Sequence, residues 1–128
     1  MTVQVNADVS TNKHKYSFTE DQTINVFLQS LLTLQEIDRA LPLQYAVCLV
    51  EIARDEGISP SILSQRTNLG LSTVSRIIAA LGDHRPNGRS YQLIHITTAT
   101  GERRRKTLYL TAAGRKAIHK ILGCLTSK

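Results

Sequence analysis

The sequence has no tryptophan, one methionine, three prolines and two cysteines, and aromatic residues make up only 5% of its 128 positions. Two cysteines, Cys48 and Cys124, are too few for a disulfide framework, and the four histidines are scattered without the spacing of metal ligands. The longest apolar runs fall well short of the ~20 residues that a membrane span requires. No apolar segment near the N-terminus resembles a signal peptide. We therefore expect a reduced, cytoplasmic protein without metal or membrane attachment.

Catalytic motifs are also missing. The sequence contains no glycine-rich phosphate loop, no nucleophile elbow and no pair of carboxylates spaced for acid and base chemistry. These absences argue against an enzyme and against a bound cofactor. A function in binding is the better expectation.

Acidic residues are scarce in one half of the chain. Residues 1–58 hold eight acidic and four basic residues, whereas residues 59–128 hold two acidic and twelve basic residues, so that the halves carry formal charges of −4 and +10. Neutralisation of phosphates with release of counterions supplies much of the affinity of nucleic-acid-binding proteins. The segregated charge predicts that the second half docks on a polyanion.

The apolar pattern predicts a mainly α-helical protein. Residues 1–17 are polar and aperiodic, and we expect a flexible arm followed by a single domain over 18–128. Thr19-Glu20-Asp21-Gln22 has the spacing of a capping box at the start of a helix over 18–40. A second helix is expected from Pro42 to about Glu56, with most of its apolar residues directed inward, and Gly57 ends it.

A helix-turn-helix is predicted over residues 59–81. Ser59 and Pro60 suit the start of its first helix, which carries Ile62 and Leu63 inward. Residues 68–70 form the turn, and Ser72 is the expected cap of the second helix. Two strand-like segments, 93–98 and 107–110, flank a basic loop and predict a hairpin wing. Thr111 then caps a last helix that extends to about residue 126.

The run from Leu41 to about Leu122 resembles the MarR family of winged helix-turn-helix regulators. The resemblance rests on residues 58–64, on residues 69–78, and above all on Glu102-Arg103-Arg104 followed by a strand that ends Leu110-Thr111-Ala112-Ala113-Gly114. It implies a winged-helix domain over 42–110 in a symmetric dimer, flanked by dimerisation helices over 18–40 and 111–126.

The candidate DNA-contacting residues lie on the second helix and on the wing. Short hydroxyl side chains allow close approach to base edges, arginine can chelate guanine, and clustered cations on a hairpin suit phosphates and the minor groove. Four further basic residues are weaker candidates for phosphate contacts. The stronger set is Ser72, Thr73, Ser75, Arg76, Arg103, Arg104, Arg105 and Lys106; the weaker set is Arg66, Arg85, Arg89 and Lys116.

The first helix is an expected dimer interface, because it carries an apolar stripe that a small domain has little room to bury. The last helix also has an apolar face, and the resemblance implies that it belongs to the same interface. The stripes comprise Ile24, Phe27, Leu28, Leu31 and Leu34, and Ile118, Ile121 and Leu122. We therefore expect a homodimeric, sequence-specific regulator that binds an inverted repeat in double-stranded DNA. The alternative is an architectural or assembly module with little sequence preference. The sequence leaves open whether a small-molecule effector or a protein partner exists, and whether the regulator represses or activates.

Overall fold

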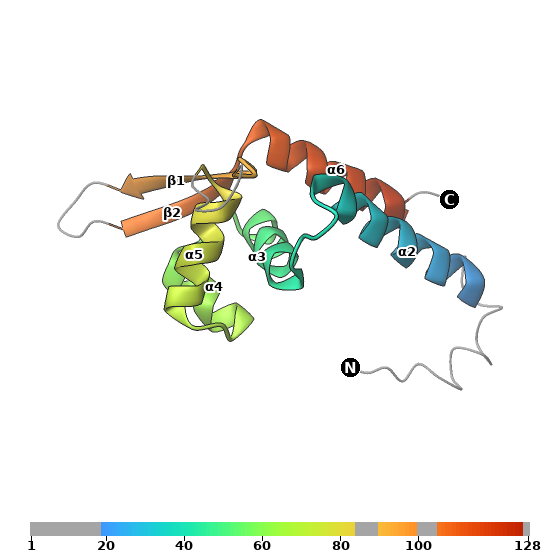
Figure 1. The fold of residues 1–128 in the computed structure, drawn as a ribbon, viewed down its shortest axis with the longest axis horizontal. Helices are drawn as coiled ribbons and strands as arrows, with labels where there is room; N and C mark the ends of the chain where they lie inside the picture. Colours follow the sequence, from blue (N-terminus) through green and yellow to red (C-terminus); the bar gives the residue numbers. More distant parts are fainter. Residues whose placement is uncertain (1–18, 84–89, 100–104, 127–128) are drawn as a thin grey trace.

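A computed structural model describes residues 19–83, 90–99 and 105–126 of the chain. Figure 1 shows a winged-helix body on one side, from which a pair of helices extends away. In chain order the elements are α2 (Glu20–Ile37), α3 (Leu43–Arg54), α4 (Pro60–Thr67), α5 (Leu71–Leu81), β1 (Ile94–Ala99), β2 (Arg105–Leu110) and α6 (Ala112–Thr126). The expected mainly α-helical fold with a β-hairpin wing is confirmed. The expected arm over residues 1–17 lies outside the described residues.

Local capping signals fix the beginnings of three helices. The Thr19 hydroxyl accepts a hydrogen bond from the Gln22 amide at 3.1 Å, and the Gln22 side chain accepts one from the Thr19 amide at 2.7 Å, which completes the predicted capping box. Ser59 caps α4 through the amide of Ile62, and Pro60 occupies the first helical position. At α6 the Thr111 hydroxyl accepts from the Gly114 amide at 3.0 Å.

The start of α5 differs from the prediction. Gly70 is its N-cap, without a side-chain cap bond, and Leu71 is its first residue, so Ser72 lies inside the first turn. The preceding turn was predicted correctly: Asn68 takes the left-handed conformation, with φ of 60°, that ends α4. The Ser64 hydroxyl donates to the Leu69 carbonyl at 2.6 Å and holds this turn closed.

The wing is an antiparallel pair in which Ile94 lies opposite Leu110 and Ala99 opposite Arg105. Its second strand therefore begins two residues earlier than predicted and includes the basic pair Arg105 and Lys106. On the body side, Ile58 bridges to Leu108 and ties the wing to the segment that precedes α4.

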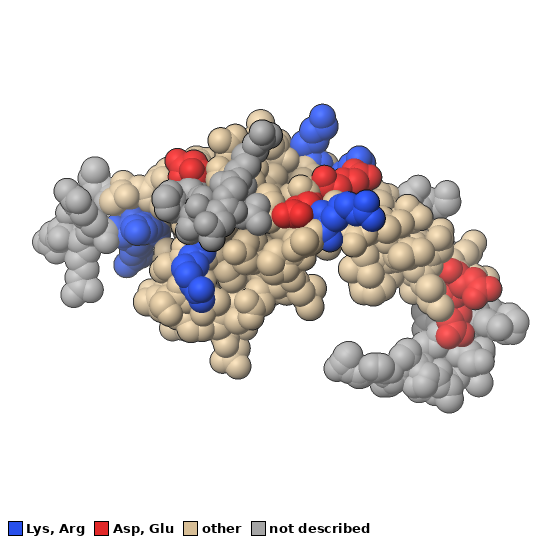
Figure 2. Space-filling view, viewed as in Figure 1, with Lys and Arg blue, Asp and Glu red and all other residues tan. Residues whose placement is uncertain are grey.

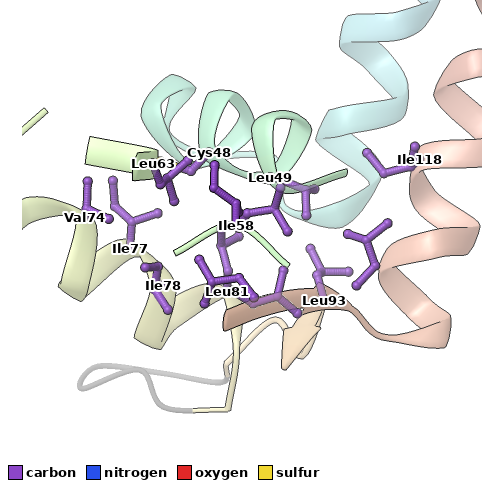
Figure 3. Packing of buried hydrophobic residues seen from close by; sticks show 14 residues of the cluster. Cys48, Leu49, Ile58, Leu63, Val74, Ile77, Ile78, Leu81, Leu93 and Ile118 are labelled. Carbon is purple, nitrogen blue, oxygen red and sulfur yellow. The ribbon is translucent and has the colours of Figure 1, made fainter. Parts of the chain in front are cut away.

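The core lies between α3, α4, α5, the hairpin and the first part of α6 (Figure 3). Leu49, Leu63 and Leu108, which come from α3, α4 and β2, are fully buried at its centre. Not every apolar residue faces it. Val47 and Val50 of α3 and Ile62 of α4 were predicted to point inward but are 41%, 46% and 38% exposed, because each helix turns only one face toward the core.

Two contacts fix α6 to this body. Gly114 packs so closely on the backbone before β1 that a Cβ built on it would lie 2.0 Å from the Leu93 carbonyl oxygen. The Glu56 carboxylate accepts hydrogen bonds from both terminal nitrogens of Arg115, at 2.8 and 3.2 Å, and from the Leu110 amide at 2.9 Å. The bonds from Arg115 and then from Leu110 hold the pKa of Glu56 below its usual value of 4.5.

Helix α2 packs mainly along α6, and the two run side by side in Figure 1. The face that it turns toward α6 is partly polar: Ser30 and Thr33 are buried, and the Thr33 hydroxyl lies 3.5 Å from the Cys124 sulfur. Both hydroxyls also donate to carbonyls one turn earlier in their own helix, which satisfies them in a buried position. Lys120 pairs with Glu36 at the edge of this contact.

Candidate nucleic-acid interface

A groove of about 570 Å³ lies where α4 and α5 begin and β2 starts. The side chains around it are small hydroxyls, apolar groups and two cations: Ser59, Pro60, Ser61, Ile62, Leu71, Ser75, Arg105 and Lys106. None of these lining residues is acidic. Figure 2 shows Lys and Arg side chains over the end of the molecule that carries the hairpin and α5, with an acidic group above them, while basic and acidic side chains alternate over α6 and acidic ones lie at the far end of α2. The surface is therefore electrostatically suited to phosphates.

The outer face of α5 is polar and its inner face is apolar. Ser72, Ser75 and Arg76 are exposed and Thr73 is half-buried, whereas Val74, Ile77, Ile78 and Leu81 belong to the core. The Arg76 guanidinium lies 3.5 Å from the Thr73 hydroxyl, so both side chains share this exposed surface. The structure thus brings all four predicted α5 residues to the outside of the second helix of the helix-turn-helix.

Two helix N-termini add positive potential to the groove. α4 and α5 both begin beside it, at Pro60 and Leu71, and each helix carries partial positive charge on its first amides. No side chain caps the start of α5, so its first amides remain available to an acceptor such as a phosphate oxygen.

The wing cations are only partly within the described structure. Arg105 and Lys106 are exposed, open β2 and line the groove. Arg103 and Arg104 lie outside the described residues, as do Arg85 and Arg89.

The two remaining basic candidates are placed elsewhere. Arg66 is on α4 and pairs with Asp55 at 3.0 Å, which partly neutralises it. Lys116 is on α6, where it lines a separate cavity of about 510 Å³ near the end of α2. Three of the described candidates line the groove, namely Ser75, Arg105 and Lys106. The remaining ones are not among its lining residues: Ser72, Thr73, Arg76, Arg66 and Lys116.

The predicted dimerisation stripe of α2 is largely exposed. Ile24, Phe27, Leu28 and Leu31 are 60%, 62%, 46% and 39% exposed, and Leu34 is half-buried. On α6 the stripe divides. Ile118 is buried in the core of its own chain and Ile121 packs against that core, whereas Leu122 and Leu125 are about half exposed. Ile118 thus has little surface to offer a partner.

Sequence reasoning missed the apolar part of the groove. Leu71 is 52% exposed and lines the groove together with Ser75, although it was not among the predicted site residues. The available signal was Gly70, because glycine also serves as an N-cap. A helix that begins after Gly70 places Leu71 at its first position, where the side chain is exposed. In the described ranges no three His, Cys, Asp or Glu side chains are placed to hold a metal ion. Within the same ranges, no helix is long and apolar enough to cross a membrane.

No protein-family model matches this sequence, and no curated protein matches it significantly. Solved structures do match. RV1404 from Mycobacterium tuberculosis aligns with a TM-score of 0.66 and 17% identity over 97% of this chain and 77% of its own. MarR aligns with a TM-score of 0.57 and 19% identity over 83% of this chain and 74% of its own. The chain has the winged-helix fold of MarR-family regulators.

A third similar structure comes from Bordetella bronchiseptica. Its BpsR protein, a DNA-binding protein regulated by 6-hydroxynicotinic acid, aligns with a TM-score of 0.55 and 17% identity over 80% of this chain and 74% of its own. In the MarR-like fold, α4 and α5 are the helix-turn-helix, the hairpin is the wing, and α2 and α6 are the flanking helices.

Proposed function

We propose that this protein is a transcriptional regulator that binds double-stranded DNA in a sequence-specific manner, as a homodimer on an inverted repeat. The observation that carries the proposal is the groove, in which the start of α5 and the cations of β2 share one surface whose lining holds no acidic residue. A recognition helix enters the major groove with its N-terminal residues foremost, and flanking cations hold the phosphates. Similar structures such as MarR and BpsR support the proposal.

Within this proposal each side chain has a distinct part. Arg76 is long enough to form a bidentate contact with guanine, while Ser72, Thr73 and Ser75 contact base edges or phosphates at short range. Arg105 and Lys106 contact phosphates beside the recognition helix, and Arg103 and Arg104 extend the wing contacts. Arg66 contributes little, because Asp55 already pairs with it.

The exposed face of α2 supports the proposed dimer. Within one protomer, α2 packs its partly polar face against α6. Its apolar stripe faces solvent and comprises Ile24, Phe27, Leu28 and Leu31. Contiguous apolar surface of this kind marks protein–protein interfaces, and Leu122 of α6 is also about half exposed. A two-fold interface here would set two recognition helices on successive major grooves, with half-sites centred about 10 base pairs apart or a multiple of that spacing.

The decisive experiment measures binding to duplex DNA over a salt series, comparing a sequence selected from a random pool with unselected DNA. We expect steep salt dependence and a preference of about 10³-fold or more for the selected sequence. Steep salt dependence without that preference would replace the regulator with an architectural module. Absence of duplex binding would refute both.

Arg76→Ala tests the reading role of α5. We expect it to reduce the preference for the selected sequence by roughly ten-fold or more, since a bidentate contact contributes about 1–3 kcal/mol of discrimination. Arg54→Ala is the matched control: Arg54 is an exposed arginine that pairs with Glu51 and lies on α3, outside the helix-turn-helix. Equal specificity in the two variants would show that α5 is not the reading helix.

A further inference from the structure

The lining of the groove includes two exposed apolar side chains among polar and basic ones. Leu71 is 52% exposed at the first position of α5, and Ile62 of α4, 38% exposed, lines the same groove. Arg105 and Lys106 border it on the wing side. An apolar pair among phosphate-binding groups suits an apolar partner, because burial against such a partner adds stabilisation that apolar surface in water lacks.

Helix formation does not account for Leu71. At a helix start the apolar contact that fixes the incoming chain joins the residue before the N-cap to the fourth helical residue. With Gly70 as the N-cap, those positions are Leu69 and Val74, which pack against and within the core. Leu71 lies between them in sequence but is left exposed on the outer side of the helix.

The major groove of DNA offers one apolar group on its base edges, the C5 methyl of thymine, and 5-methylcytosine carries the same group. Leu71 and Ser75 are four residues apart and therefore share a face of α5. The first residues of a recognition helix are the ones that reach base edges. A pyrimidine methyl is thus the ligand whose chemistry and position match this apolar pair.

Building on the DNA-binding function proposed above, we propose that Leu71, with Ile62 beside it, reads the C5 methyl of a pyrimidine in each half-site. The contact buries the methyl against the leucine side chain and selects thymine over unmethylated cytosine at that position. Specificity then has two components on α5: a polar contact from Arg76 and an apolar contact from Leu71.

The test uses the selected duplex with single thymines replaced by deoxyuridine, which removes only the methyl. One position is expected to be sensitive, with affinity about four-fold weaker for one half-site and about fifteen-fold weaker when both are changed, the equivalent of about 0.8 kcal/mol for each methyl. In Leu71→Ala the thymine and deoxyuridine duplexes should bind equally at that position. Leu43→Ala, at a leucine 73% exposed on α3 and outside the groove lining, should keep the difference.

A third duplex distinguishes the two sources of the methyl. Cytosine and 5-methylcytosine are compared at the sensitive position, each paired with guanine. Tighter binding of the methylated form, again lost in Leu71→Ala, supports methyl reading irrespective of the base. Equal binding of the two forms beside a clear effect of deoxyuridine supports reading of thymine alone.

The proposal is overturned if no thymine is sensitive to loss of its methyl, or if Leu71→Ala keeps the sensitivity. These outcomes are separate from failure of the proposed function, which would appear earlier as absence of any selected duplex. Leu71→Ala is expected to fold, because alanine suits a helix and the side chain is exposed. Unchanged salt dependence in this variant would confirm that its phosphate contacts are intact.

Discussion

The contact of Gly114 with the backbone before β1 leads to a quantitative prediction for Gly114→Ala. The added Cβ would lie 2.0 Å from the Leu93 carbonyl oxygen and 3.0 Å from its carbon, both of them backbone atoms without rotamer freedom. Ordinary contact needs about 3.5 Å, so the start of α6 has to move by roughly 1.5 Å. That movement strains the bond from the Thr111 amide to the same oxygen, now 3.0 Å long, and draws Ile118 out of the core.

We expect Gly114→Ala to lower the free energy of unfolding by about 3 kcal/mol, the upper part of the range for overpacking, and to lower Tm by roughly 10 °C. Gly123 supplies the control on the same helix, because a Cβ there meets nothing within 4 Å. Gly123→Ala should raise stability by about 0.5–1 kcal/mol through helix propensity.

The assay is urea denaturation followed by far-ultraviolet circular dichroism, at one protein concentration because the proposed dimerisation would contribute to apparent stability. The two variants should move the urea midpoint in opposite directions with an unchanged slope. A Gly114→Ala midpoint within the range of the wild type would refute the close packing of α6 on the body. A loss of stability in both variants would refute the assignment of the effect to position 114.

Other predictions concern the interface, the wing, the carboxylate and the thiols. Leu31→Glu should give monomers by sedimentation, since a charge cannot be buried unpaired in the α2 interface; persistent dimers would place the interface elsewhere. Lys106→Gln should weaken binding to all duplexes and reduce the salt slope by about one unit, and an unchanged slope would remove β2 from the phosphate contacts. The pKa of Glu56 is lower in the folded protein than its usual value of 4.5, so the Glu56 carboxylate stabilises the fold above about pH 4.5 and loses this effect as the pH falls through its folded pKa. In Glu56→Gln the urea midpoint should therefore depend less on pH between pH 4.5 and the folded pKa. Burial, and next the charge of Glu51, raises the pKa of Cys48 to about 11, and the side chain is also buried. A thiol reagent at about pH 8 should therefore modify one thiol, Cys124, in the native protein and both thiols in urea.

The parts of the fold that sequence could predict are those set by neighbouring residues. Thr19, Ser59 and Thr111 cap their helices through amides only three residues away, so the pattern alone places these helix starts. The start of α5 was misplaced because Ser72 looks like a cap, although Gly70 already occupies that position. In the described ranges most of the expected DNA-contacting and dimerisation residues are exposed. The exceptions are Ile118, which is buried, and Thr73, Leu34 and Ile121, which are half-buried.

Tertiary packing decided the rest. Whether Leu71 or Ile118 is exposed depends on which face each helix turns toward the core. Helical spacing does not predict this, because an apolar stripe that packs within its own chain has the same spacing as one that packs against another chain. Likewise, α2 packs through Ser30 and Thr33 rather than through its most apolar stripe. Glu56 pairs with Arg115, which lies 59 residues later in the sequence, so this contact forms only when the chain has folded. Local hydrogen bonding thus determined the elements, and long-range burial determined which of their faces form the groove and which stay exposed.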